Sequence, residues 1–275
     1  MKRIAIFAHY DKHNLIDDYV VFYLKKLKEV VDEIIFISDC NIEKRELSKI
    51  NHLILDKVCT KHDEYDFGSY KRGFFLLKEK HPEKFNELEE LVFVNDSCYC
   101  VGDFKEIFNK IKKDKRTEYI GLTENNEINY HLQSYFLVIR KYIFKEDFFV
   151  NFLKNVKKLK NKETVIKNYE IGLSNLLINN NKKICAIFSC KKINEYVKKN
   201  NLTLLTELNK ILHNNNDKQT QTKIMNNLFN LNSQNHIHSN KYFFLIKMGF
   251  PLLKRLPLDN NNIYHLNEDL FSFWA

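Results

Sequence analysis

The N-terminal part of the chain alternates between short apolar runs and one amphipathic segment, and this alternation constrains the fold more than any other feature. Residues 3–10, RIAIFAHY, and residues 33–39, EIIFISD, are apolar runs with the length of buried strands. Between them, apolar residues recur at 15, 16, 19, 20, 23, 24, 27, 30 and 31, the spacing of one helix face. Strand, helix and strand in this order are typical of a parallel sheet with crossover helices.

The later segments extend this pattern. We expect Asn14 to be the N-cap of the first helix, with Asp17 completing an approximate capping box. Residues 68–90 are predicted to form one or two helices, interrupted at His81-Pro82. Further strands are predicted at 52–58, 91–94, 117–124, 133–140 and 182–189, a helix at 103–113, and a loop or weak helix at 213–236. The expected fold class is therefore α/β, with a mostly parallel sheet flanked by helices and a helical C-terminal part.

Composition favours one compact unit. The 275 residues are 44% hydrophobic and 13% aromatic, which is enough for a sizeable core. There are only 6 Gly and 3 Pro, and no Ser/Gly/Pro-rich stretch that would act as a flexible linker. We therefore expect a single domain over residues 1–275.

The net charge of +9 favours anionic partners such as phosphates, nucleic acid or an anionic lipid surface. The alternative is that lysines coat solvent-facing helices, as in KKLKEV and NVKKLKNK. The sequence contains no Arg-rich groove motif and no RNA-binding aromatic motif, so we expect no nucleic-acid partner.

Cysteine spacing and the N-terminus indicate a cytoplasmic protein. Cys98 and Cys100 form C-x-C and the other four cysteines are scattered, so the paired C-x-x-C spacing of zinc sites is missing. MKR leads directly into the first strand without the form of a signal peptide, and we expect reduced cysteines. The late apolar stretch YFFLIKMGFPLLK is broken by Lys247 and Pro251 and is too short to span a bilayer.

Three predicted strands end in polar residues. Open α/β sheets bind ligands outside the carboxyl ends of their strands, where a carboxylate can hold a divalent cation that in turn holds a diphosphate. Lys71 and Arg72 in YDFGSYKRG could add phosphate contacts. The alternative is that each polar end is an ordinary strand-to-turn junction. The three ends are His9-Tyr10-Asp11, Ser38-Asp39 and Asn95-Asp96-Ser97. No G-x-G-x-x-G or Walker A loop is present, which weighs against dinucleotide-binding and P-loop enzymes.

These segments, in this order, resemble the rhamnan-synthesis F family, which comprises glycosyltransferase-like proteins of polysaccharide assembly. The matching segments are AHYDKHNLIDDYVVFYLKKL, EIIFISD, EYDFGSYKRG, LVFVNDSCYCVG, HLQSYFLVI, YEIGLS and HSNKYFFLIKMGFPLLKR. The resemblance implies a GT-A-like fold, with a nucleotide-sugar half at 1–125 and an acceptor half with C-terminal helices at 126–275. It also implies a nucleotide-sugar donor and a surface-polysaccharide acceptor.

The resemblance further implies a divalent cation, Mn²⁺ or Mg²⁺. In GT-A-like enzymes an acidic strand-end motif, usually D-x-D, coordinates the metal that bridges the donor diphosphate, and Asn95-Asp96-Ser97 takes that place here. Asp96 is the only carboxylate of the three, a departure from the pattern that puts metal dependence in question. His236 and His238 are the candidates for further ligands, and the alternative for both is solvent exposure in an Asn-rich segment.

Glycosyl transfer by inversion also needs a base that deprotonates the acceptor hydroxyl. The resemblance places Glu170, at a predicted helix start, in that role, and the alternative is a carboxylate that only complements the helix dipole. Glu124 at another strand end is the second candidate, and Asp147 the third. The expected donor-binding residues include Asn95, with His9, Tyr10, Asp11 and Asp39 for the base and ribose, Asp66 and Lys71 near the ribose and phosphates, and Lys254 for the leaving diphosphate.

We therefore expect a glycosyltransferase that transfers a sugar from a dTDP, UDP or GDP donor to a lipid-linked glycan. The family name suggests rhamnose as the sugar. The alternative is a non-catalytic nucleotide- or carbohydrate-binding component of a glycan-assembly complex. HSNKYFFLIKMGFPLLKRLPL would suit peripheral contact with the inner face of the cytoplasmic membrane, with Lys247, Lys254 and Arg255 meeting anionic headgroups. The alternative is that residues 242–253 pack as a core helix and turn.

Overall fold

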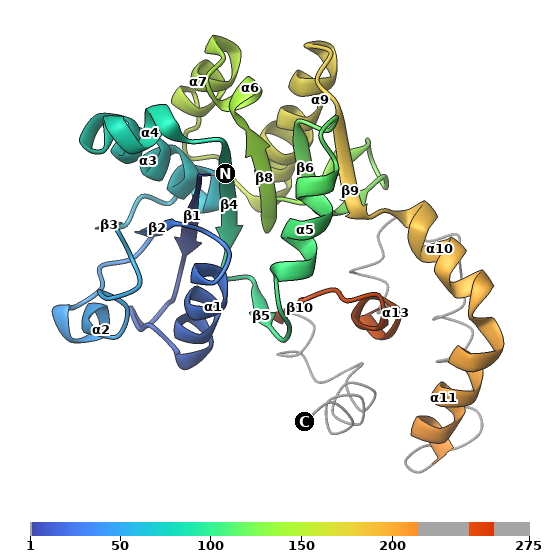
Figure 1. The fold of residues 1–275 in the computed structure, drawn as a ribbon. Coiled ribbons are helices and arrows are strands. Elements are labelled where there is room, and N and C mark those ends of the chain that lie inside the picture. The colour runs from blue at the N-terminus through green and yellow to red at the C-terminus, as the bar shows by residue number, and fades with distance from the viewer. Residues whose placement is uncertain (1, 214–241, 256–275) are drawn as a thin grey trace.

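The computed structural model of the chain describes residues 2–213 and 242–255, and within them one mixed sheet forms the centre (Figure 1). Its strand order is β3-β2-β1-β4-β8-β6-β7, with β9 also paired to β6. The strands are β1 (Arg3–His9), β2 (Glu33–Ser38), β3 (Asp56–Cys59), β4 (Glu90–Asn95), β6 (Tyr119–Asn125), β7 (His131–Leu132), β8 (Phe136–Arg140) and β9 (Ile184–Phe188). The predicted single domain over 1–275 extends beyond the described residues and stays a prediction.

The strand directions confirm the predicted α/β class. Strands β3, β2, β1 and β4 are mutually parallel, β8 runs antiparallel to β4 and β6, and β9 is parallel to β6. Every residue of β4 is buried, and so is all of β1 after Arg3. Burial on both faces explains why these strands are continuous apolar runs rather than alternating ones.

Helices cover both faces of the sheet (Figure 1). One hydrophobic core joins the sheet to α1 (Asp18–Lys28), α5 (Lys105–Lys113), α10 (Cys190–Lys199) and α13 (Tyr242–Lys247). The other joins it to α3 (Tyr65–Lys80), α4 (Pro82–Glu87), α6 (Lys141–Phe144), α7 (Asp147–Lys154) and α9 (Gly172–Asn179). The remaining helices are α2 (Lys44–Ser48), α8 (Lys162–Val165), the π-helix η1 (Ile166–Ile171) and α11 (Asn201–His213).

Helix α3 lies directly against β1 because residue 73 has no side chain. A Cβ atom on Gly73 would come 2.4 Å from Cγ2 of Ile6, which is closer than real Cβ contacts. This close approach brings the N-terminal turn of α3 up to the carboxyl end of β1.

A small second sheet joins residues 252–254 to the segment that follows β4. β5 (Cys98–Cys100) pairs antiparallel with β10 (Leu252–Lys254), and the chain enters β10 through Gly249, whose φ of +85° favours glycine. The aromatic side chains of α13 are buried, so the alternative predicted for 242–253, a core helix and turn, is confirmed. The apolar side chains predicted to dip into a bilayer are instead in the core. Within 2–213 and 242–255, no helix has the length and apolar character to cross a membrane.

Several predicted boundaries differ from the structure; for example, the strand predicted at 133–140 begins at Phe136, and the helix predicted from residue 68 begins at Tyr65. The first helix begins at Asp18 with Asp17 as its N-cap, while Asn14 has φ 60° and lies in a preceding turn. The carboxylate of Asp11 holds that turn by accepting from the backbone N–H groups of residues 13 and 15. The third strand begins at Asp56, so residues 52–55 of the predicted strand belong to the connection before it.

Candidate active site

A cavity of about 580 Å³ lies at the carboxyl ends of β1, β2 and β4. From β1 the chain continues to β2 and β3 on one side of the sheet and later returns to β4 on the other. The cavity therefore lies at the point where the strand order reverses, which is where open α/β sheets bind ligands. Eight residues singled out from the sequence line it: His9, Tyr10, Asp39, Asp66, Asn95, Asp96, Glu170 and Lys254.

Other predicted residues lie outside this cavity, each with a structural role. Asp11 holds the turn before α1. Lys71 pairs with Glu64, with its ammonium 2.7 Å from the carboxylate. Glu124 accepts from the backbone N–H of Cys190 at 2.9 Å. Asp147, the weakest candidate base, is exposed in the first turn of α7. His236 and His238 fall outside the described residues.

Asp96 is buried at the end of β4, among hydrogen-bond donors and positive groups. Its Oδ2 accepts the backbone N–H of Tyr10 at 3.0 Å and lies 3.9 Å from both His9 Nε2 and Arg255 Nη1. Burial raises the pKa of the Asp96 carboxyl, while His9, the Tyr10 N–H and Arg255 oppose that shift. Burial also lowers the pKa of His9. Asp96 thus joins the ends of β1 and β4 at the cavity.

The two neighbours of Asp96 are hydrogen-bonded to each other and to the cavity wall. Asn95 accepts the Ser97 N–H on its Oδ1 at 3.1 Å and donates from Nδ2 to Asp66 Oδ2 at 3.0 Å. Ser97 in turn accepts from the ammonium of Lys254 at 2.8 Å. Residues 2–213 and 242–255 contain no group of three or more His, Cys, Asp or Glu side chains that could hold a metal ion. Within the described residues Asp96 is therefore the single carboxylate of this strand end, and the other two predicted metal ligands, His236 and His238, lie outside them.

Two carboxylates that line the cavity, Asp66 and Glu170, meet at Ser134. Asp66 Oδ2 accepts the Ser134 hydroxyl at 2.9 Å, and Glu170 Oε1 accepts the Ser134 N–H at 2.6 Å. Burial, reinforced by the charge of Glu170, raises the pKa of Asp66. The second Glu170 oxygen, Oε2, lies 3.8 Å from His131 Nε2. A carboxylate held this way at a cavity wall can accept a proton from a bound hydroxyl.

Glu170 was predicted to lie at a helix start, and this prediction is wrong. It lies in η1, a π-helical turn between α8 and α9, so helical structure runs from residue 162 to residue 179. A carboxylate there is too far from the N-terminus to complement the dipole, because that effect fades within the first turn. Single π-helical turns inside α-helices occur frequently at functional sites.

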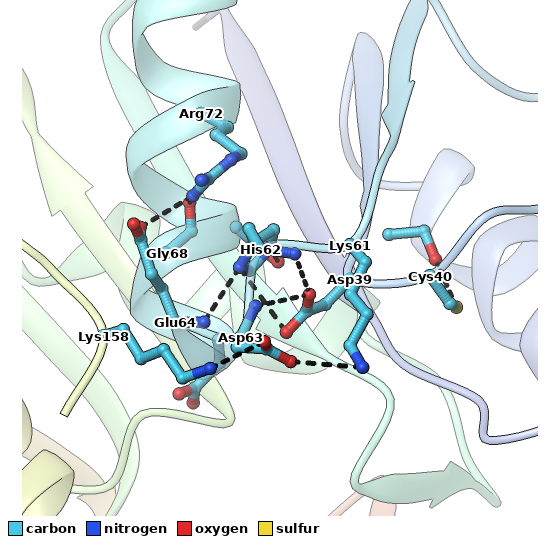
Figure 2. Close-up of polar contacts among 12 residues, drawn as sticks. Asp39, Cys40, Lys61, His62, Asp63, Glu64, Gly68, Arg72 and Lys158 are labelled. Carbon is cyan, nitrogen blue, oxygen red and sulfur yellow. Dashed lines mark hydrogen bonds and ion pairs between the residues drawn. The ribbon is translucent and has the colours of Figure 1, made fainter. Parts of the chain in front are cut away.

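Asp39, directly after β2, holds a loop at the edge of the cavity (Figure 2). Its Oδ1 accepts the backbone N–H groups of His62 and Asp63, the latter at 2.8 Å, just before α3. Asp63 pairs with Lys158 at 2.8 Å, so this loop also contacts the segment between α7 and α8. Asp39 therefore shapes the cavity, and its predicted contact with a nucleotide stays a prediction.

The sequence reasoning missed several lining residues. Lys158, Lys160 and Lys162 line the cavity, the first two from a non-helical connection. The sequence analysis gave a helix coat as the alternative for the NVKKLKNK run and did not name these lysines as site residues. Tyr65 also lines it, with 42% of its surface exposed and a φ of 56°. The available signal for the lysines was their density directly before Asn161, a good helix N-cap residue.

The family model described as rhamnan synthesis protein F matches residues 34–250. No curated protein matches the chain.

Among solved structures, three similar ones share low identity with this chain. A 4-diphosphocytidyl-2C-methyl-D-erythritol synthase from Anaerococcus prevotii DSM 20548 has a TM-score of 0.41 and 11% identity, covering 68% of this chain and 88% of that one. A glycosyltransferase involved in glycosylation of the major capsid of PBCV-1 has a TM-score of 0.39 and 11% identity, covering 71% of this chain and 88% of that one. Core-mannan synthase A from Aspergillus fumigatus, in an Mn/GDP form, has a TM-score of 0.38 and 10% identity, covering 62% of this chain and 69% of that one.

Proposed function

The chain belongs to the rhamnan synthesis protein F family, and from that premise we propose that it is a glycosyltransferase whose active site is the cavity at the ends of β1 and β4. The observation that carries this proposal is the pairing of two chemistries in one cavity. Asp66 and Glu170 supply carboxylates to the cavity lining, and Lys254 supplies an ammonium. A base for the acceptor and a cation for a leaving phosphate are the two groups that such a transfer needs.

The donor we propose is a nucleoside-diphosphate sugar. Tyr10 and Tyr65 line the cavity with 57% and 42% of their surfaces exposed, so each offers a flat aromatic face for a nucleobase. Four lysines line the same cavity and suit the charge of a diphosphate. The family description favours rhamnose as the sugar, and dTDP, UDP and GDP are the nucleotides to compare.

The proposed reaction uses Glu170 as the base. The acceptor hydroxyl oxygen attacks the anomeric carbon while its proton passes to Glu170. We assign Oε2 as the receiving oxygen, because Oε1 already accepts the Ser134 N–H. The bond from the anomeric carbon to the diphosphate oxygen breaks, and its electron pair stays on the diphosphate. Attack opposite the leaving group inverts the anomeric configuration.

The acceptor we propose is a growing surface polysaccharide on a lipid carrier, met at the cytoplasmic face of the membrane. Support for it comes from the family description and from the excess of Lys and Arg over Asp and Glu, 44 against 35. Since most apolar side chains of residues 242–253 are buried in the core, membrane contact would have to use mainly other surfaces.

A donor panel tests this function. Purified protein is incubated with dTDP-, UDP- and GDP-sugars and lipid-linked acceptors, and release of the nucleoside diphosphate is measured alongside nucleotide binding. We expect one donor to give acceptor-dependent release, with Glu124→Gln behaving as wild type because Glu124 lies outside the cavity. Tight nucleotide binding without release for every donor and acceptor would instead favour the non-catalytic component.

A further inference from the structure

We propose that this cavity neutralises the donor diphosphate with the ammonium of Lys254 and does so without a divalent cation. The inference rests on the proposed function and deepens it, because it assigns the phosphate-binding group. It starts from the strand end of β4, where the side chains of residues 95–97 face the cavity.

The polar groups next to the Asp96 carboxylate are already engaged within the protein. The amide oxygen of Asn95 accepts from both the N–H and the hydroxyl of Ser97, and its nitrogen donates to Asp66. The hydroxyl oxygen of Ser97 accepts from Lys254. A divalent cation at a phosphate site is usually held by one or two carboxylates together with substrate phosphates and waters. Here only Asp96 could serve without breaking one of these contacts, because Asn95 and Ser97 would have to give up theirs.

The side-chain charges next to Asp96 are positive, and they would repel a bound cation. Arg255 lies 3.9 Å from Asp96 Oδ2 and donates to the Asp96 carbonyl oxygen at 3.2 Å. The guanidinium stacks over Tyr19, 4.5 Å from its ring centroid, which fixes it in place. With Lys254 on Ser97, two side-chain cations flank the one carboxylate of the strand end. This arrangement supplies the positive charge that the strand end would otherwise obtain from a metal.

Strand pairing positions Lys254. In the register of β5 with β10, Lys254 lies opposite Cys98, and the next N–H, that of Arg255, donates to Ser97 O at 3.0 Å. The Lys254 N–H donates to the Tyr242 hydroxyl at 3.2 Å. Its ammonium lies 5.2 Å from the ring centroid of Tyr135, another lining residue. The ammonium is thus held over the strand end before any ligand binds.

An ammonium here can perform one defined step. When the bond between the anomeric carbon and the diphosphate breaks, the electron pair remains on the departing oxygen, and Lys254 meets that charge with N–H donors. No proton has to move, since the ammonium already carries its charge. Lys158, Lys160 and Lys162 line the same cavity and can meet the remaining phosphate oxygens.

The test compares binding of inorganic pyrophosphate and of dTDP, UDP and GDP by calorimetry, in EDTA and in Mn²⁺. We expect pyrophosphate and one nucleoside diphosphate to bind in EDTA with Kd values within about threefold of those in Mn²⁺. Lys254→Met should weaken both by about tenfold or more, the loss expected for a charge-assisted contact. Lys78→Met, which removes an exposed lysine of α3 outside the cavity, should leave both unchanged.

The outcomes separate this inference from the function on which it rests. Binding in Mn²⁺ that disappears in EDTA would overturn the inference and leave the transferase proposal standing. Pyrophosphate binding that Lys254→Met abolishes, with no binding of any nucleoside diphosphate, would support the phosphate site and contradict the proposed donor. If pyrophosphate, dTDP, UDP and GDP all fail to bind, in EDTA and in Mn²⁺, the inference and the proposed function are both overturned. The EDTA comparison uses the wild-type chain, so it decides the metal question even if Lys254→Met does not fold.

Discussion

The ammonium of Lys254 lies 2.8 Å from the hydroxyl oxygen of Ser97, although 157 positions separate them in the sequence. This contact joins the strand end of β4, where an acidic motif was expected, to a cation from the late part of the chain. The expected carboxylate is present as Asp96, but it faces donors and positive charge. The phosphate chemistry of the site is therefore assigned to a lysine, and the proton chemistry to the wall formed by Asp66 and Glu170.

Glu170→Gln should lower turnover by roughly 100- to 10,000-fold, the usual effect of losing a general base. Donor binding should stay within a few-fold of wild type, because the amide keeps the shape and its oxygen can still accept the Ser134 N–H. Steady-state kinetics with a saturating donor measure the first effect and calorimetry the second. Glu124→Gln is the matched control, and a large rate loss in that variant would move the base to Glu124.

Asp96→Ala should reduce both stability and transfer. Its removal leaves the N–H of Tyr10 unpaired, and an unsatisfied buried donor costs about 1–3 kcal/mol. Asp96→Asn keeps an acceptor for that N–H, so its melting temperature should lie closer to wild type. Denaturant unfolding of both variants measures this difference. Equal stability of the alanine variant and wild type would show that the Tyr10 contact contributes nothing.

Asp66→Asn should stabilise the protein at pH 8 while it impairs the site. The pKa of Asp66 is raised by burial and by Glu170, so the folded state holds its proton more tightly than the unfolded state. Wild-type stability therefore falls as the pH rises from the unfolded pKa through the raised folded pKa. The advantage of the asparagine should be full above the folded pKa and shrink as the pH is lowered.

Melting temperatures at pH 8 and pH 5 measure this trend. Asp147→Asn is the control: its carboxylate is exposed in the first turn of α7, where removal of the charge should be neutral or slightly destabilising. A larger advantage for Asp66→Asn at pH 5 than at pH 8 would contradict the assigned direction of the Asp66 pKa.

Gly73→Val should destabilise the fold by about 1–3 kcal/mol, the usual effect of overpacking a core. The added Cβ would clash with Ile6 across the interface of α3 and β1. Urea unfolding measures the loss. The severe clash is with Ile6, since the next side chain, Ile37, would lie 3.2 Å from the added Cβ. Adding Ile6→Ala should therefore cost less than the sum of the two single changes, and strict additivity would argue against this contact.

The sheet and its binding edge could be predicted because the information is local. β1, β2 and β4 are apolar runs followed by polar residues, and the rule for open α/β sheets brings their carboxyl ends together. His9, Asp39 and Asp96 therefore reach one cavity, as the sequence pattern indicated.

The rest depends on contacts that leave little trace in the sequence. The pairing of β5 with β10 joins two short strands far apart in the chain, and only their register brings Lys254 to Ser97. The lysines of residues 157–162 have no periodicity that separates a cavity wall from a helix coat. Glu170 owes its orientation to a π-helical turn, which has no simple sequence pattern. Predictions for His236 and His238 lie outside the described residues.

The most direct measurement of the central claim is transfer itself, with a donor labelled at the anomeric carbon and followed by NMR. We expect the label to appear in the acceptor with inverted configuration and one nucleoside diphosphate to be released per sugar transferred. Glu170→Gln should slow the appearance of the label by roughly 100-fold or more. Nucleoside diphosphate that binds in the cavity, with no label reaching any acceptor, would contradict the account.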